Sequence, residues 1–326
     1  MKKKEYLCNL SEYNLIIKNM KRNLFLLIIF FGISLGLFSK ELNVASYNIR
    51  LLTKVDYEHN DGWEQRRDIL CDLIRFQNFD AFGAQEVTHP QLQDMLQRLP
   101  DYDYVGVGRD DGAEKGEYSP VFFNKKRFKK LENGTFWLSE TPNEVSYGWD
   151  AVCRRVCSYV HLKDLETKQE FWFFNAHLDH VGVKARREGV KLIVAKIAEL
   201  ADNTDNVVVT GDFNVNQFSE AYETVVGTGK LVDSYTIANT RFAPGGTFNG
   251  WDPAKFTISR IDHIFVGKGT KVSRYGILTN HYWLGEKTSD AEFKAAPKEI
   301  KAEKREIHNP SDHYPINAWI TFPRKK

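Results

Sequence analysis

Six apolar segments of the chain end in side chains of the kinds that bind metals or transfer protons. Each segment has the pattern of a strand, and carboxylates, amides or imidazoles follow it. Taken singly, such a residue is more often a turn Asn, a loop Asp or a histidine packed in a core. Six such endings together indicate a functional site at one rim of a sheet, because strands hold side chains rigidly while loops leave the rim open. The segment ends lie at residues 47–48, 85–86, 175–177, 211–214, 260–263 and 311–313.

The chemistry of these side chains favours a hard cation and phosphoryl transfer. They offer oxygen and imidazole donors without a thiolate, which suits Mg²⁺, with Mn²⁺ or Ca²⁺ as alternatives, rather than structural zinc. Hydrolysis of a phosphoester needs a cation on the phosphate oxygens, an oriented nucleophile and stabilisation of the developing charge. Asp212 and Asn214 lie two residues apart on one extended segment, so both point the same way and suit joint binding of nucleophile and phosphate.

Alternating strand and helix patterns must position these residues. Strand-like runs and helical patterns alternate from residue 42 onward without a linker, repeat or low-complexity tract, which predicts one α/β domain with a mixed sheet system over residues 40–326. The segment 290–305, rich in Lys, Glu and Ala, is interpreted as a solvated helix or loop insertion. Helices are predicted at 63–76, 89–99 and 184–200, and strands at 42–48, 80–86, 102–108, 119–124, 152–162, 171–178, 206–210, 261–266 and 314–322.

Composition and charge limit the classes of function. The 326 residues are 42% apolar, 27% charged and 13% aromatic, which excludes a disordered, collagen-like or multispan membrane protein. Of 45 basic and 43 acidic residues, six basic and two acidic ones precede residue 40, so the remainder carries a net charge of −2. A body with this charge lacks the global positive field of a nonspecific nucleic-acid binder.

The four cysteines do not indicate a disulfide framework, because only three lie beyond residue 39 and they are spread over a long chain. Cys153 and Cys157 fall in the strand predicted at 152–162, where residues four apart lie roughly 13 Å apart on one face. No second Cys or His pair at zinc spacing accompanies them, so we interpret them as small buried hydrophobes.

Residues 1–39 have the pattern of an export signal. A 15-residue apolar run at 24–38 follows Lys18, Lys21 and Arg22. It is shorter than the about 20 residues that span a bilayer and fits the apolar region of a signal peptide. Met20 is an alternative start, and an uncleaved N-terminal anchor is the alternative to cleavage. We expect a periplasmic or extracellular protein; detection of the chain in the cytoplasm with residues 20–39 still attached would contradict this.

Over residues 42–322 the chain resembles the endonuclease/exonuclease/phosphatase superfamily, which includes deoxyribonuclease I, exonuclease III and inositol polyphosphate 5-phosphatases. The six segment ends stand in the family's order, and Gly-Asp-Phe-Asn at 211–214 and Ser-Asp-His at 311–313 are the most specific. The resemblance implies a four-layer α/β sandwich, with two mixed β-sheets packed face to face and flanked by helices. The site is then expected where the strand ends meet.

The resemblance also implies metal ligands. Glu86 is expected to bind the divalent cation with help from Asn48, and Asp312 to be a further metal or water ligand.

It implies catalytic roles for a second group of residues. Asp212 is expected to orient the attacking water, Asn214 to hold phosphate, and His177 to stabilise the transition state or the leaving group. His313, polarised by a carboxylate, acts as base or as electrostatic stabiliser, and Asp262 is that carboxylate or a metal contact.

Five further residues are weaker candidates for binding substrate. Glu117 precedes a strand where some family members have an acid, with an ordinary loop acid as the alternative. Arg50, Arg154 and Arg155 are suited to phosphate as bidentate donors, although only one of the two adjacent arginines can face a site from an alternating strand. Trp251 lies in a loop at 239–256 that looks suited to recognition, with packing at the rim as the alternative.

The leading interpretation is an exported divalent-metal phosphoester hydrolase, a phosphodiesterase or phosphatase acting on a phosphorylated small molecule, sugar or lipid headgroup. A nuclease acting on DNA or RNA is the alternative within the family. A noncatalytic binding protein on the same fold is the alternative of another class, disfavoured because every expected catalytic position is filled. No obligate protein partner and no apolar hairpin for insertion into lipid are evident in the sequence.

Overall fold

The computed structural model describes residues 40–201, 206–291 and 297–323, with the single positions 18, 20, 21, 293 and 295. Residues 41–326 form one unit and residues 1–40 another. The apolar run of the predicted export signal, at 24–38, lies outside the described residues. Within the described part of the chain, no helix is both long enough and apolar enough to span a membrane.

The first sheet has seven strands and carries the N-terminal half of the site. Its central strand β1 runs parallel to β2 and antiparallel to β15. All seven residues of β1 are buried, as expected for a strand covered on both faces. The spatial order is β10 (Thr240–Phe242), β12 (Lys271–Ile277), β15 (Ile316–Thr321), β1 (Leu42–Asn48), β2 (Ala81–Gln85), β4 (Val121–Asn124) and β3 (Tyr102–Val105).

The second sheet has six strands and carries most of the remaining site. Strands β7 and β8 are parallel neighbours, whereas β11 runs antiparallel to β8. The spatial order is β5 (Phe128–Trp137), β6 (Val156–Asp164), β7 (Glu170–His177), β8 (Val207–Asp212), β11 (Asp262–Gly267) and β9 (Leu231–Asp233).

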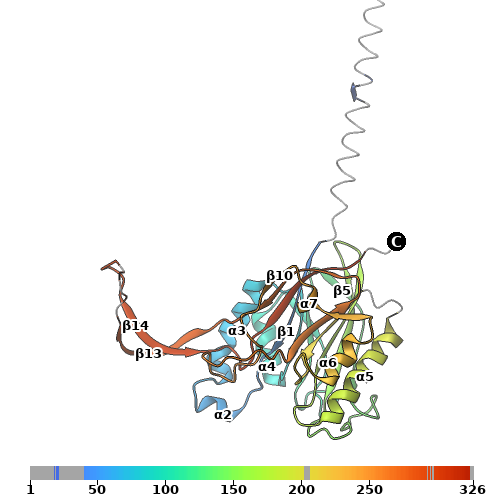
Figure 1. The fold of residues 1–326 in the computed structure, drawn as a ribbon, viewed down its shortest axis with the longest axis horizontal. Coiled ribbons are helices and arrows are strands. Elements are labelled where there is room, and N and C mark those ends of the chain that lie inside the picture. The colour runs from blue at the N-terminus through green and yellow to red at the C-terminus, as the bar shows by residue number, and fades with distance from the viewer. Residues whose placement is uncertain are drawn as a thin grey trace, which may run out of the picture. The chain divides into compact units, whose positions relative to one another are not determined.

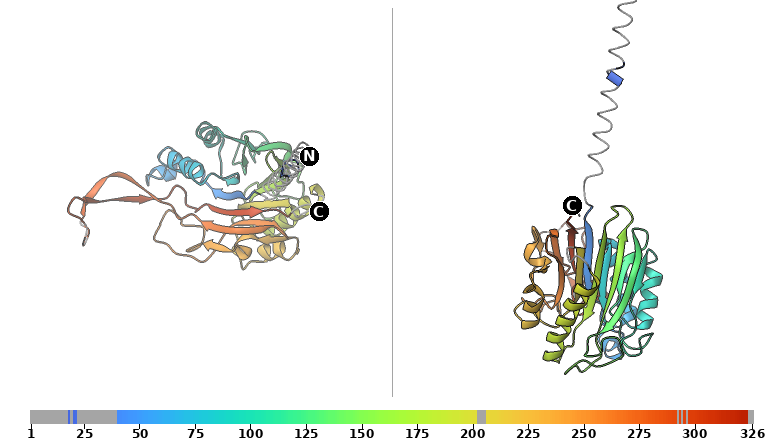
Figure 2. Two further views of the ribbon diagram at one scale, coloured as in Figure 1. Left: turned by 90° about the horizontal axis from the view of Figure 1, so that it is seen from above. Right: turned by 90° about the vertical axis from the view of Figure 1, so that its right-hand side faces the viewer.

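Side-chain alternation along the strands builds three apolar layers and confirms the predicted sandwich. On β1, Leu42 and Val44 join an inner core that contains Phe171 and Phe173 of the second sheet. Ala45 and Tyr47 point to the outer face. Figure 2 shows the two sheets side by side between two groups of helices. Helices α3 (Trp63–Gln77) and α4 (His89–Arg98) cover the first sheet, α5 (Val183–Leu200) and α6 (Glu220–Val226) cover the second, and α2 (Lys54–Tyr57) and α7 (Ser234–Ile237) are single turns.

The segment 290–305 departs from one of its two interpretations, because none of its described residues is helical. They lie within a hairpin of β13 (Tyr282–Ala291) and β14 (Ala302–His308), which projects from the body as an arm (Figure 1). The Lys, Glu and Ala composition that favours a helix is overridden by cross-strand pairing. The arm exposes Trp283, Phe293, Ile300 and Ile307, but charged residues separate them, so the hairpin is long without being continuously apolar.

The strand predicted at 152–162 begins later than expected, and this changes the surroundings of two residues. Strand β6 starts at Val156, so Cys153 lies in the preceding loop and is only partly buried, whereas Cys157 is buried in the strand. The description of both as buried residues on one strand is therefore wrong for Cys153. Arg154 and Arg155 also lie in the loop rather than on an alternating strand.

Candidate active site

The topology brings the predicted residues to one rim. Parallel β1 and β2 end together, with Asn48 opposite Gln85, and parallel β7 and β8 end together, with His177 opposite Asp212. Strand β11 is antiparallel to β8 and starts where β8 ends, so Asp262 also lies opposite Asp212.

Asp212 lies at the centre of this rim. Its Oδ2 accepts a hydrogen bond from Asn48 Nδ2 at 3.0 Å, across the two sheets. The same oxygen is 3.5 Å from His177 Nε2 and 3.7 Å from His313 Nε2. Burial raises the pKa of Asp212 to about 7; Asp262 adds to the rise and His313 opposes it. A carboxylate with this pKa is suited to accepting a proton near neutral pH.

His313 is held as a cation. Its Nδ1 is 2.9 Å from Asp262 Oδ2, and both side chains are buried. Burial disfavours the charged ring, but Asp262 and Asp212 together raise the pKa of His313 well above its usual value. With Nδ1–H donated to Asp262, the Nε2–H faces Asp212 and the open rim. In this arrangement the ring can donate a proton or stabilise negative charge.

His177 has the opposite character. Burial and the nearby guanidinium groups of Arg155 and Arg109 lower the pKa of His177 well below its usual value, so the ring is neutral. Asn214 Nδ2 lies 3.1 Å from its Nε2, and the hydrogen-bond network therefore assigns the ring proton to Nδ1. This Nδ1 is 3.7 Å from Glu117 Oε2. One charged and one neutral imidazole at a single carboxylate are a usual basis for separate acid and base roles.

Glu86 has the properties of a cation ligand. It accepts hydrogen bonds from Asn48 Nδ2 at 3.1 Å and from the Leu51 amide at 3.0 Å. Burial opposes its ionisation, but the Asn48 hydrogen bond and the charge of His313 lower the pKa of Glu86. Ligand atoms of Glu86, His177 and Asp212 lie within 4.8 Å of one another. The donor set fits a hard divalent cation.

Asn48 contacts this cluster through hydrogen bonds, whereas Asp312 interacts with it through charge. The Asn48 amide nitrogen faces both carboxylates, while its Oδ1 accepts the Arg50 amide hydrogen, so the geometry favours orientation of Glu86 by Asn48. Burial raises the pKa of Asp312; Glu86 adds to that rise and His313 opposes it. A cation between Asp312 and Glu86 would relieve this repulsion. Their roles as ligands stay predictions.

Among the weaker candidates, Glu117 and Arg155 lie at the site. Glu117 forms an ion pair with Arg109 at 2.7 Å and lies 3.9 Å from Arg155 Nη1. Burial raises the pKa of Glu117, and the positive charge of Arg109 opposes that rise. Arg155 is buried and lies 3.6 Å from Asp179. Arg154 instead turns to Asp110, at 3.3 Å. Only one of the adjacent arginines therefore faces the cluster, as expected, but loop geometry rather than strand alternation separates them.

The other two weaker candidates lie at the edge. Arg50 forms two 3.1 Å hydrogen bonds with Asp56 and lies 3.8 Å from Asp312. Trp251 packs over the guanidinium of Arg66, 5.5 Å from the ring centre.

Arg66 is a structural residue that the sequence analysis missed. Its guanidinium is fully buried and donates to the carbonyls of Ile49, Arg50, Asp61 and Pro310. It thereby ties the chain after β1 to the chain before Asp312. An arginine on an amphipathic helix is usually solvated, so no pattern in the sequence indicated this contact.

We expect Arg66→Leu to lower the free energy of unfolding by about 3 kcal/mol or more, because several buried carbonyls would lose their donor. Denaturant unfolding of both proteins measures the change. Arg75→Leu on the same helix is the control; Arg75 is 56% exposed, and surface substitutions usually change stability by less than about 0.5 kcal/mol. Equal effects of the two substitutions would contradict the assignment.

Three residues that follow site strands have a left-handed backbone. Arg50, Glu86 and Asn214 have φ values of 58°, 62° and 49°. This conformation disfavours side chains other than Gly, Asn and Asp by roughly 1–2 kcal/mol, and such strain concentrates at functional sites. Here it turns the chain sharply where β1, β2 and β8 end.

Comparisons with known proteins identify the family and the fold. The model of the Endonuclease/Exonuclease/phosphatase family matches residues 45–313. A solved mannosyl-6-phosphatase of Bacteroides thetaiotaomicron is 45% identical, with a TM-score of 0.78, over 86% of this chain and all of that chain. An endonuclease/exonuclease/phosphatase family protein of the same organism is 44% identical, with a TM-score of 0.79, over 87% of this chain and 99% of that one. The catalytic domain of human nocturnin, at 17% identity and a TM-score of 0.60 over 87% and 95% of the two chains, shares the fold.

Proposed function

The chain belongs to the endonuclease/exonuclease/phosphatase family, and from that premise we propose that it is a divalent-metal-dependent hydrolase of phosphoester bonds in compact substrates, with a phosphorylated sugar as the first candidate. The observation that carries the proposal is the group around Asp212. A charged His313 and a neutral His177 both lie within 3.7 Å of its carboxylate. A noncatalytic binding protein would not require this pairing.

The residues of the chain divide the chemistry among them. Glu86, with Asp312 beside it, would hold the divalent cation, which supplies neutralisation of the phosphate oxygens when bound. Asp212 would orient the attacking water and accept its proton. His313 would donate from Nε2 to a phosphoryl oxygen as negative charge develops there.

Asn214 and His177 would complete the site from the other side. The Asn214 amide nitrogen is 3.1 Å from His177 Nε2 and donates to the Leu178 carbonyl at 3.0 Å; bound phosphate would replace His177 as the acceptor of its second hydrogen. His177 would stabilise the leaving group, and its Nδ1 lies 3.7 Å from the Glu117 carboxylate, beyond hydrogen-bond distance.

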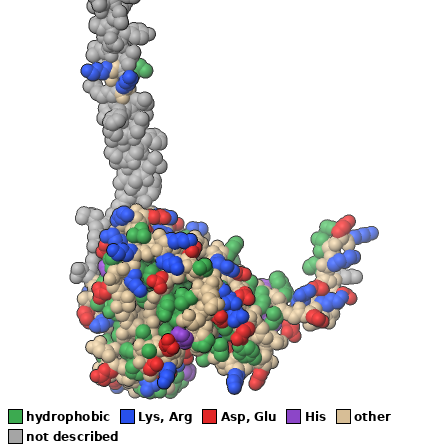
Figure 3. Space-filling view, turned by 180° about the vertical axis from the view of Figure 1, so that it is seen from behind, with side chains coloured by type: hydrophobic (Ala, Val, Ile, Leu, Met, Phe, Trp, Pro, Cys, Tyr) green, Lys and Arg blue, Asp and Glu red, His purple; other side chains and the backbone are tan. Residues whose placement is uncertain are grey.

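Two observations support a compact sugar substrate over duplex nucleic acid. The mannosyl-6-phosphatase is 45% identical over its whole length, whereas the likeness to nocturnin concerns the fold alone. The chain beyond residue 39 carries a net charge of −2. On the face seen in Figure 3, basic and acidic side chains are interspersed and form no continuous basic track.

A substrate screen with a salt titration tests this proposal. With Mg²⁺, purified protein is expected to hydrolyse mannose 6-phosphate faster than bis(p-nitrophenyl) phosphate, a phospholipid or plasmid DNA. Turnover on the best substrate should change only a few-fold between about 50 and 200 mM salt, because a compact ligand displaces few counterions, whereas a many-contact DNA binder loses ~10³ or more in affinity. Efficient cleavage of plasmid DNA that collapses over this salt range would identify a nuclease instead.

A further inference from the structure

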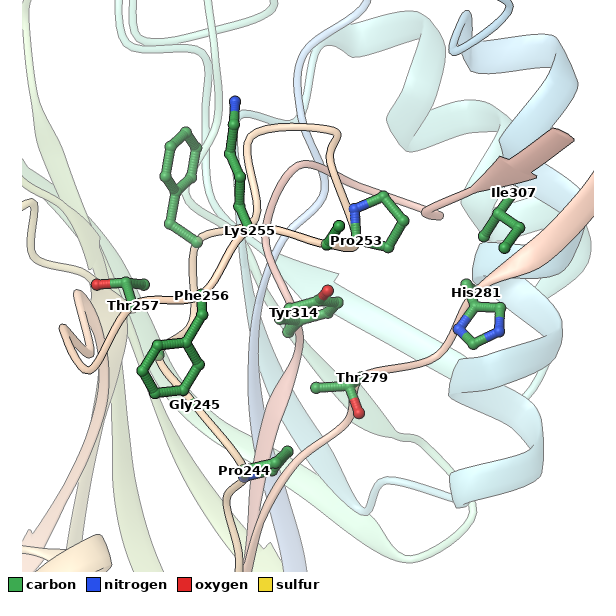
Figure 4. A pocket seen from close by; sticks show the side chains of 13 residues that line it. Pro244, Gly245, Pro253, Lys255, Phe256, Thr257, Thr279, His281, Ile307 and Tyr314 are labelled. Atoms are coloured by element: carbon green, nitrogen blue, oxygen red, sulfur yellow. The ribbon is translucent and has the colours of Figure 1, made fainter.

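A cavity of about 490 Å³ lies beside the catalytic rim and has no part in the chemistry described above. The loop 244–257, residues 279–281 of the chain leading to β13, and Tyr314 form its walls. In Figure 4, Tyr314 and Thr279 lie between Phe256 on one side and His281 on the other. This volume is within the roughly 300–1,000 Å³ of small-molecule binding sites.

The cavity and the catalytic rim share a wall. Phe248, which lines the cavity, packs edge-on against His313 with ring centres 4.9 Å apart. The backbone of the loop is hydrogen-bonded to the catalytic segment: the Asn249 and Gly250 amides donate to the Asp312 carbonyl at 2.8 and 3.1 Å. The Tyr314 amide donates to the Thr247 carbonyl at 2.7 Å. A ligand that spans Phe248 would therefore reach both the cavity and the phosphate site.

The walls have the chemistry of a carbohydrate site. Phe248 and Phe256 are 45% and 74% exposed and both line the cavity, so their rings are accessible to a ligand there. Lys255, His281 and Thr279 add groups that can hydrogen-bond to hydroxyls, and no acidic side chain lines the cavity. Sugar rings offer apolar C–H faces to aromatic rings and hydroxyls to polar groups, so both parts of the wall would be used.

The position of Phe248 determines which part of a substrate can occupy the cavity. With phosphate at His313 Nε2, the sugar that carries it would lie against Phe248. The cavity beyond, with Phe256 and His281, would then be left for the following sugar units. Resting on the proposed function, we infer that this cavity binds the glycan attached to the phosphorylated sugar, so that the substrate is a phosphorylated oligosaccharide rather than a free sugar phosphate.

Phe256→Ala tests this inference, with Phe76→Ala as the matched control. Phe76 is 85% exposed on α3 and does not line the cavity. The substrates are mannose 6-phosphate and a mannotriose phosphorylated at C6 of its non-reducing end. Wild-type protein and the control should prefer the trisaccharide, mainly through KM. Phe256→Ala should raise KM for the trisaccharide roughly five- to ten-fold, the loss expected for one aromatic contact, and change kcat/KM for mannose 6-phosphate less than two-fold.

Equal kcat/KM values of the wild type for the two substrates would overturn the inference, as would equal effects of Phe256→Ala on both. Calorimetry with unphosphorylated mannotriose separates this inference from the proposed function. If the wild type hydrolyses neither phosphate, the proposed function fails. If mannotriose binds the wild type and Phe76→Ala equally but binds Phe256→Ala more weakly, the cavity would still be supported as a glycan site. Absence of mannotriose binding to the wild type would refute it.

Discussion

Replacement of His313 or His177 with Ala is expected to lower kcat by about 10² to 10⁴ while the protein stays folded. This is the usual effect of losing one group for proton transfer or charge stabilisation. His313 should act as a cation held by Asp262, and His177 as a neutral ring that Asn214 contacts at Nε2. Steady-state kinetics with Mg²⁺ and thermal melting, followed by circular dichroism, measure the two properties separately.

The pH profile adds a readout specific to His313. Because its pKa is raised, the cation is present at neutral pH and is lost as the pH rises through the folded-state value. Activity of the wild type should therefore fall on the alkaline side, and the residual activity of His313→Ala should lack that limb. Asp262→Asn should shift the limb to lower pH. His59→Ala, at an exposed histidine, should leave kinetics unchanged. A fall in melting temperature with a proportionate loss of activity would show that the histidines are only structural.

Replacement of Glu86 with Gln is expected to weaken Mg²⁺ binding and activity together, each by on the order of 10² or more. Even supporting residues around metal sites change affinity by about 10- to 100-fold, and Gln removes the ionised carboxylate that would hold the cation. Isothermal titration calorimetry with Mg²⁺ measures the binding directly. Chelation of the wild type should abolish activity, and added Mg²⁺ should restore it.

Glu58→Gln is the matched control, since Glu58 is exposed after the short helix α2. It should bind Mg²⁺ as the wild type does. Unchanged Mg²⁺ affinity in Glu86→Gln would show that the ligand is wrongly assigned, and Asp312, a buried carboxylate near Glu86, would then be the next candidate.

Much of the fold could be predicted because its central strands are buried on both faces. The strands β7 and β8 contain the continuous apolar runs 171–174 and 207–209, and such runs are visible in a sequence. Strand β5, from Phe128 to Trp137, was missed because its middle residues are exposed and include Lys and Glu. The hairpin at 282–308 was missed because its strands are largely exposed and rich in charged residues, and cross-strand pairing overrides their local propensity.

The residues of the candidate site could be predicted, but their states could not. Glu86 and Asp212 stand at the ends of apolar strands, whereas His313 precedes strand β15 and follows a polar segment. The side-chain types of all three indicated the chemistry. The opposite pKa shifts of the two histidines depend on which charged groups lie beside each ring, and those neighbours come from distant segments. The pairing of Glu117 with Arg109 and the carbonyl contacts of Arg66 are set by loop conformations that no local pattern specifies.

The hydrogen bonds between residues 247–250 and 312–314 also bear on how this protein can evolve. The same loop walls the cavity and supports the backbone of Asp312 and His313, so we expect a change at Thr247, Phe248 or Asn249 to alter specificity and turnover together. Residues 253–257 line the cavity without these contacts and can vary more freely. Adaptation to a new substrate is therefore expected to begin there, and selection from libraries randomised separately at the two stretches would show it.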